Sequence, residues 1–115
     1  MTVSELLQWQ WQGYTRYHQT RANLLLHIVV VPLFWLGSIG LVVALLQASW
    51  LTGLGSLGAL VVSVAAQGRG HAWEPVPSEP FTSKANAVQR VLLEQWVTFP
   101  HFVLSGGWAR AWRQA

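Results

Sequence analysis

Two long apolar runs separated by a short turn dominate the pattern of hydrophobic and polar positions along the chain. The first run covers residues 24–46. At 1.5 Å per residue it spans about 34 Å, which is enough to cross a hydrocarbon core. The second run, residues 50–66, spans about 25 Å, at the short end for a crossing. Gln47 to Trp50 form an uncharged turn between the runs. The pattern therefore predicts two transmembrane helices, about 24–46 and 50–67, paired as a hairpin.

Shorter amphipathic segments lie on either side of this hairpin. Residues 3–18 place apolar and aromatic side chains at spacings of three and four, which predicts an amphipathic helix. Residues 75–82 contain Pro75, Pro77 and Pro80 and predict a loop. Thr82 or Ser83 then caps a last helix with one apolar face. The predicted faces are Val3, Leu7, Trp11, Tyr14 and His18 in the first helix, and Ala85, Val88, Leu92, Trp96 and Phe99 in the last.

Length and composition support a single membrane domain. With 115 residues the chain has room for one domain, residues 1–115. Apolar residues make up 52% and charged residues 10%, whereas a soluble domain has roughly 25% charged residues. The eight tryptophans suit the headgroup region of a bilayer. We therefore expect an all-α integral membrane helical bundle with an amphipathic N-terminal helix, a two-helix transmembrane hairpin and a C-terminal helix. The sequence leaves open whether the chain forms a homo-oligomer.

The net charge of +3 matters less than the placement of the charges. All seven Lys and Arg residues and all four acidic residues lie outside residues 22–68. By the positive-inside tendency, the side that holds both termini is cytoplasmic, in the inner membrane of a bacterium or the endoplasmic reticulum of a eukaryote. The basic residues form no cluster or stripe, so nucleic-acid binding is not expected. Residues 1–20 are polar and aromatic and do not have the pattern of a cleavable signal peptide.

Two polar segments flank the apolar stretch and carry three of the four histidines. They are Tyr17-His18-xxxx-Asn23-xxx-His27 and Gln67-xx-Gly70-His71-xx-Glu74. Gln67, His71 and Glu74 are spaced to share one helix face, and the same spacing relates Asn23 to His27. Because a hairpin returns to the membrane face from which it started, both segments meet at one interfacial site. We interpret them as a metal site. The alternative for the second segment is a His71–Glu74 pair at a helix end.

His18 poses a geometric problem because it precedes His27 by nine residues. On one straight helix the two rings would lie on opposite faces and about 13 Å apart along the axis. We therefore expect a turn between Thr20 and Asn23 that folds the first helix back, so that His18 points at His27 and His71. The fourth histidine, His101, has no polar neighbour at helical spacing and is interpreted as a bundle or interface residue.

The absence of cysteine limits the chemistry of any metal site. It excludes disulfides, thiolate zinc sites and iron–sulfur clusters. Imidazole-rich sites without thiolates suit iron, zinc, copper or nickel. A site at the mouth of a hairpin would also meet an amphiphile, whose acyl chain stays in the bilayer while its carboxylate reaches the metal. Arg16, Arg21 and Arg69 are the candidate partners of that carboxylate.

The combination of Tyr17-His18-xxxx-Asn23-xxx-His27-xxxx-Pro32 with Gln67-xx-Gly70-His71-xx-Glu74 resembles the membrane 2-hydroxy fatty acid dioxygenase family over about residues 14–82. That family is named for metabolism of phytosphingosine to odd-numbered fatty acids. The resemblance implies a non-haem enzyme that uses Fe(II) and O2 to convert a 2-hydroxy fatty acid into the acid one carbon shorter, with release of carbon dioxide and water. It implies His18, His27 and His71 as iron ligands. Asn23, Gln67 and Glu74 match polar motif positions and would support the ligands, with Glu74 also a candidate catalytic group.

Two other functions remain open at the level of sequence. A bis-histidine haem membrane protein would use two histidines, such as His27 and His71, as axial ligands, and predicts an intense Soret absorption. A non-catalytic membrane module would bind a protein or lipid partner through its glycine-rich face and its tryptophans. That module predicts that no metal co-purifies with the protein.

Overall fold

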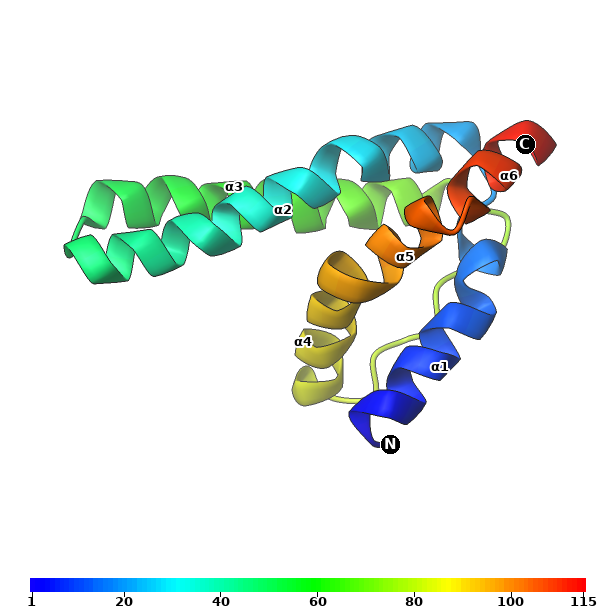
Figure 1. Cartoon of the computed structure of the whole chain (residues 1–115), viewed down its shortest axis with the longest axis horizontal. Helices are drawn as coiled ribbons and strands as arrows, with labels where there is room; N and C mark the ends of the chain where they lie inside the picture. The colour runs from blue at the N-terminus through cyan, green and yellow to red at the C-terminus, as the bar shows by residue number, and fades with distance from the viewer.

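The two apolar runs form an antiparallel pair of long helices, α2 (Arg21–Gln47) and α3 (Trp50–Ala72), which extends away from the rest of the chain (Figure 1). The computed structural model describes residues 1–115 and contains no strand. The other helical elements are α1 (Val3–Gly13), a 3-10 helix (Tyr14–Tyr17), α4 (Lys84–Leu93), a π-helical segment (Glu94–Thr98), α5 (Phe99–Leu104) and α6 (Gly107–Gln114). Since α4, the π-helical segment and α5 follow one another without a break, the fold consists of five helices. The expected all-α class and the expected hairpin are confirmed.

The hairpin turns where the sequence predicted. Ala48 adopts the left-handed conformation, with φ 51°, directly after α2. Ser49 then caps α3 by accepting a hydrogen bond from the backbone N–H of Thr52. At its other end α3 continues to Ala72, past the end expected near residue 67, because no proline interrupts the chain before Pro75. This extension keeps His71 on the helix.

Most apolar side chains of the hairpin point away from the protein. Both helices are long and apolar enough to cross a membrane, yet in their most hydrophobic stretches only 28% of α2 and 11% of α3 is buried. Leu36, Leu45 and Leu46 are among the exposed side chains of α2. The core helix of a soluble protein buries most of such residues. The face of α3 that packs on α2 buries only small or polar residues, which are Ser56, Ser63, Gln67 and Gly70.

The first helix begins where expected but packs through a different face. Thr2 and Glu5 form a capping box at its start, with each side chain accepting a hydrogen bond from the other residue's backbone N–H. The predicted face is wrong in part, because Val3 and Trp11 are exposed while Leu6 is buried. After Gly13 the chain forms a 3-10 turn, which has fewer residues per turn than an α-helix. Tyr14 and His18 are buried, although Val3 and Trp11 of the same predicted face are exposed.

The last long helix is capped by Ser83, as predicted, but its apolar face is also wrong. Val88, Leu92 and Trp96 are exposed, whereas Gln95 and Phe99 are buried. Val88 and Leu92 lie in α4, on its exposed side. For the residues that follow, the reason is the π-helical segment, in which the Phe99 N–H bonds to the Glu94 carbonyl, five residues back. One extra residue in a helical turn rotates all later side chains by about 100°. The segment lies just before Pro100, which has no N–H to continue the regular pattern.

The core lies at the open end of the hairpin, where α1, α5 and α6 gather around the start of α2 (Figure 1). It consists of Tyr14, Leu24, Val31, Phe99, Phe102 and Ala111. The last helix, α6, closes this core: the indole of Trp108 donates to the Leu24 carbonyl, and the guanidinium of Arg21 lies over the Trp112 ring. The small bundle therefore clamps the end of the hairpin that carries the polar segments.

Candidate metal centre

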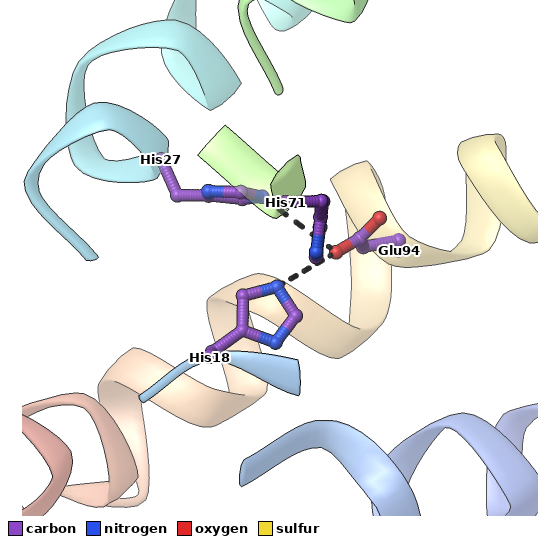
Figure 2. A group of neighbouring side chains, drawn as sticks. All are labelled: His18, His27, His71 and Glu94. Atoms are coloured by element: carbon purple, nitrogen blue, oxygen red, sulfur yellow. Dashed lines mark ion pairs between the residues drawn. The ribbon is translucent and has the colours of Figure 1, made fainter. Parts of the chain in front are cut away.

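Four side chains from four separate elements converge at the open end of the hairpin (Figure 2). His18 follows the 3-10 helix, His27 lies in α2, His71 lies in the last turn of α3, and Glu94 begins the π-helical segment. One nitrogen or carboxylate oxygen from each lies within 4.8 Å of those of the other three. The histidines expected from the two polar segments therefore do come together. The carboxylate that joins them is Glu94.

A break in the chain at residues 18–20 carries His18 to this position. The break comes earlier than the turn expected between Thr20 and Asn23, because Thr20 is already the cap of α2 and accepts a hydrogen bond from the Asn23 N–H. Residues Gln19 and Thr20 lie outside any helix and leave their backbone N–H groups without helical partners. Both donate to the carboxylate of Glu74, at 2.7 and 3.1 Å.

Glu74 is therefore part of the scaffold and lies outside the four-residue cluster. Its carboxylate also accepts hydrogen bonds from the Thr20 hydroxyl and the Asn23 amide, at 2.9 and 3.0 Å. Burial raises the pKa of this carboxyl, but the hydrogen bonds from Gln19, Thr20 and Asn23 outweigh it and lower the pKa below its ordinary value. An ionised Glu74 thus ties the end of α3 to the start of α2, between His18 and His27 in the sequence.

Backbone carbonyls orient two of the three imidazoles. The Nδ1 atoms of His18 and His27 lie 2.7 Å from the Tyr14 carbonyl and 3.0 Å from the Asn23 carbonyl, respectively. A carbonyl only accepts, so Nδ1 carries a hydrogen in both rings, and Nε2 is the nitrogen that a neutral imidazole can offer to a metal. These two Nε2 atoms are buried without a hydrogen-bond partner, as is Nδ1 of His71. Imidazoles that bind metals are commonly held in this way through the other ring nitrogen.

The carboxylate of Glu94 faces the two unpartnered Nε2 atoms. Its Oε2 lies 3.5 Å from Nε2 of His18 and 4.0 Å from Nε2 of His27 (Figure 2). The hydroxyl of Tyr14 donates to the same oxygen at 2.9 Å. Burial raises the pKa of Glu94, but the nearby His18, and then His27 and His71, bring the pKa down to about 2. Burial and the Glu94 carboxylate raise the pKa of Tyr14 well above its ordinary value, so the phenol stays protonated.

A buried amide network holds the π-helical segment against α3. Gln67 and Gln95 exchange two hydrogen bonds, at 2.8 and 2.7 Å, and Gln67 also donates to Ser63. The indole of Trp35 donates to the backbone carbonyl of Gln95. Gln67 was expected to support the ligands, and the structure places it next to the residue that follows Glu94. The Gln67–Gln95 pair therefore helps to position Glu94, the acidic residue of the cluster.

The four side chains fit a transition-metal ion. Atoms that bind one ion at about 2.1 Å lie at most about 4.2 Å apart, so small rotations would bring the observed atoms onto a common centre. Three imidazoles with one carboxylate form a donor set suited to iron, zinc, copper or nickel. Three buried ring nitrogens without partners are costly in the absence of a ligand. We therefore regard the cluster as a candidate metal site, bordered by a cavity of about 570 Å3 into which His18, His71 and Glu94 face.

Sequence reasoning missed Glu94, and His101, interpreted from the sequence as a bundle or interface residue, is not one of the four clustered residues. His101 is exposed and its ring stacks on Trp11 at 3.8 Å, remote from the cluster. The signal for Glu94 was the polar pair Glu94-Gln95 within the otherwise apolar stretch from Val91 to Phe99. Comparisons with protein-family models, curated proteins and solved structures found no match for this chain. The geometry of the cluster is therefore the main structural evidence on function.

Proposed function

We propose that this protein is a membrane-bound, iron(II)-dependent dioxygenase that converts 2-hydroxy fatty acids into the fatty acid one carbon shorter. The observation that carries the proposal is the convergence of three unpartnered imidazole nitrogens and one ionised carboxylate at the mouth of an apolar hairpin. The resemblance of the two polar segments to the membrane 2-hydroxy fatty acid dioxygenase family supports the substrate class. His18, His27, His71 and Glu94 would hold the metal.

The proposed reaction needs no separate reductant. A 2-hydroxy acid and O2 give the shortened acid, carbon dioxide and water, and O2 takes up all the electrons that the substrate loses when its C1–C2 bond breaks. Iron(II) supplies open coordination positions at which an organic substrate and O2 can meet. The protein contributes a set of ligands held in position before the substrate arrives. It also contributes an access route through the cavity beside the cluster.

Individual residues of the chain have distinct roles in this proposal. The carbonyls of Tyr14 and Asn23 hold the His18 and His27 rings with Nε2 facing the centre. Glu94, with a pKa of about 2, stays ionised at neutral pH and offsets part of the positive charge of the ion. Tyr14 remains protonated and keeps its hydrogen bond to Glu94, which fixes the direction of the carboxylate. Glu74, a candidate catalytic group in the sequence, accepts hydrogen bonds from the Gln19 and Thr20 N–H groups just before α2 and from the Asn23 amide.

A bilayer is the environment that best suits the exposed surface of the hairpin. Every backbone N–H and C=O within a spanning helix is satisfied internally, and lipid covers apolar side chains at no cost. The buried side of α3 is polar and small while its outer side is apolar, the reverse of a soluble helix. We therefore propose an integral membrane protein with both termini on the cytoplasmic side, in the inner membrane of a bacterium or the endoplasmic reticulum of a eukaryote.

The two rival functions fit the geometry less well. A haem between two axial histidines keeps their rings on opposite sides of a planar macrocycle, whereas the rings of His27 and His71 make edge contact with centroids 5.1 Å apart. A non-catalytic module gives no reason to bury three imidazole nitrogens without partners. A site for a single metal ion accounts for both the close contact of the imidazole rings and their unpartnered nitrogens.

Metal analysis combined with turnover tests the proposal. Protein purified without a histidine tag, loaded anaerobically with Fe(II) and transferred to air, should consume O2 and release carbon dioxide from C1 of a 2-hydroxy fatty acid. His27→Ala should lose both bound iron and turnover. His101→Ala is the matched control, because this histidine lies outside the cluster, and it should retain both.

Two results would contradict the proposal. Wild-type protein that binds no iron, or His27→Ala that keeps full turnover, would remove the metal site from the mechanism. Iron binding without any oxidation of 2-hydroxy acids would keep the metal site and reject the proposed reaction.

A further inference from the structure

The cavity beside the metal centre has a mixed wall, in which polar groups lie among apolar surface. It has a volume of about 570 Å3 and lies between α1, α3, the π-helical segment and the loop at residues 78–81. Most of its lining residues are polar, among them Gln10, Gln12, Gln67 and Gln95. His18, His71 and Glu94 face its inner part. The polar groups of this wall offer hydrogen-bond partners to a headgroup, and its apolar surface can contact the first carbons of an acyl chain.

An apolar groove on α3 adjoins this cavity. The groove is lined by Leu60, which is half-buried, and by the exposed residues Val61, Val64 and Ala65. Val64 also lines the cavity, so the cavity and the groove share a wall. The groove follows α3 along the surface that we propose to face lipid. A path therefore leads from the metal centre, past Val64, to the apolar surface of the hairpin.

Two arginines line the cavity, and they differ in how their guanidinium groups are engaged. Arg90 donates to the carbonyls of Pro80 and Glu79 and lies over the rings of Trp9 and Phe81. The guanidinium of Arg16 makes no hydrogen bond within the protein and contacts only the face of Tyr17, at 5.8 Å. Arg16 therefore has donors to spare for an anion. Glu79 and Glu94 are the acidic residues of the lining, and Glu94 faces the metal centre.

Of the three arginines suggested by the sequence, only Arg16 lines the cavity. Arg21 donates to the Trp112 carbonyl and covers the Trp112 ring. Arg69 is exposed on α3 and is not part of the cavity wall. Arg16 is therefore the one of these three arginines that is placed to bind a carboxylate in the cavity.

We propose that the cavity and the groove form one binding site for a single-chain amphiphilic carboxylate that enters from the bilayer. Arg16 binds the carboxylate, the C1–C2 end lies at the His18–His71–Glu94 wall, and the acyl chain passes Val64 and follows the groove on α3. The identification of the ligand as a 2-hydroxy fatty acid rests on the proposed function, while the path itself rests on the shape and polarity of the site.

Binding of a long and a short acid tests the path. Protein in lipid nanodiscs is titrated without O2 with 2-hydroxyhexadecanoate and with 2-hydroxybutanoate, and empty nanodiscs correct for partitioning. Val64→Trp should weaken binding of the long acid by about tenfold or more, because the indole blocks the passage to the groove. The short acid, whose chain ends before the groove, should keep its affinity within about twofold. Val62→Trp is the matched control, since Val62 is also an exposed valine of α3 but lines neither site.

A second pair of variants tests the anchor. Arg16→Gln should weaken binding of both acids by about tenfold or more, because each loses a charge-assisted hydrogen bond. Arg69→Gln makes the same change in charge outside the cavity and should leave both affinities unchanged. Unaltered metal content in all four variants shows that the fold and the metal centre persist.

The outcomes separate this inference from the proposed reaction. If Val64→Trp behaves like Val62→Trp, or Arg16→Gln like Arg69→Gln, the path or the anchor is rejected even when turnover is observed. If the variants show the expected pattern but no oxidation occurs, the binding site stands and the dioxygenase function is rejected.

Discussion

The two ends of the α2–α3 hairpin are packed with different side chains. Near the turn at Ala48, the helices approach through small residues: a Cβ on Gly40 would fall on the Ser56 side chain, and one on Gly37 would meet Leu60 at 2.9 Å. No titratable side chain takes part in this contact. At the open end, the contacts are polar. Ser63 donates a hydrogen bond to a backbone carbonyl of α2, and Gln67 bonds to the π-helical segment. His71 belongs to the candidate metal cluster.

The difference shows how one hairpin can serve two purposes. Small residues allow close approach of helices in lipid, where apolar packing has no hydrophobic driving force between helices. Polar residues in the same position would be costly unless every group is satisfied. At the open end they are largely satisfied, except for the ring nitrogens that we assign to a metal and the Asn23 Oδ1. The closed end is held together by close packing of small residues, and the open end by hydrogen bonds around the candidate metal site.

The largest expected effect is on metal binding at the open end. Glu94→Gln replaces an anionic ligand with a neutral amide and should weaken Fe(II) binding by at least about 100-fold. Glu74→Gln makes the same change in a carboxylate that accepts from the Gln19 and Thr20 N–H groups and lies outside the cluster. It should reduce metal affinity far less. Competition with a chelator measures both affinities. Equal losses in the two variants would contradict the assignment of Glu94 as the ligand.

Glycine-to-alanine changes compare the two ends directly. A Cβ at Gly70 would collide with the Asn23 amide oxygen and lie 2.7 Å from Leu26. Since Glu74 holds Asn23 in place, Gly70→Ala should lower the free energy of unfolding by about 1–3 kcal/mol and disturb metal binding. Gly40→Ala meets the Ser56 hydroxyl, which can rotate away.

Gly40→Ala should therefore cost less stability and leave metal binding intact. Gly68→Ala serves as the control at the open end, because a Cβ there would meet nothing within 4 Å. Chemical denaturation and metal titration of the three variants give the comparison. A loss of metal in Gly40→Ala equal to that in Gly70→Ala would show that the two ends are not independent.

A smaller effect is expected from two serines at equivalent depth in the interface. Ser63 donates to the Val30 carbonyl and accepts from Gln67, so Ser63→Ala should cost about 1 kcal/mol. Ser56 makes no hydrogen bond in the structure, and Ser56→Ala should change stability by no more than a few tenths of that value. Urea unfolding in matched micelles measures both. A larger loss for Ser56→Ala would reverse the contrast between the ends.

Acid should loosen the open end of α2 and leave the closed end unaffected. The pKa of Glu74 is lower in the folded protein than in the unfolded chain, so its contribution is complete above its ordinary pKa of about 4.3. That contribution is lost as the pH falls through the folded pKa. Amide hydrogen exchange, corrected for intrinsic rates, should show falling protection of Gln19 and Thr20 below about pH 4.3.

The amide of Thr52 is the internal control, because an uncharged serine caps it at the closed end. Glu74→Gln should abolish the dependence on pH at Gln19 and Thr20. Persistence of that dependence in the variant would mean that another group controls the start of α2.

Much of the hairpin could be predicted because it depends on local properties of the chain. Long apolar runs specify helices of sufficient length, and the Gln47–Trp50 interruption specifies where they turn. The spacing of Asn23 and His27, and of Gln67 and His71, places each pair on one helix face. The return of the chain then brings His27 and His71 to the same end. The same logic failed for Val3, Trp11, Leu92 and Trp96, because apolar spacing predicts a helix but does not determine which of its faces packs against the bundle.

Local sequence patterns were sufficient to specify two apolar helices joined near Ala48, a chemistry without thiols, and three histidines at one end of the hairpin. Which carboxylate lies beside them depends on how distant parts of the chain pack together. Glu94 begins the π-helical segment, and the Gln67–Gln95 pair holds that segment against α3, with the Glu94 carboxylate at the cluster. Glu74, adjacent to His71 in the pattern, turns instead to the N–H groups that the break at residues 18–20 leaves free. Which carboxylate joins the cluster and which one binds backbone N–H groups depends on polar groups that are distant in the sequence and lack other partners. Local sequence patterns do not identify these groups.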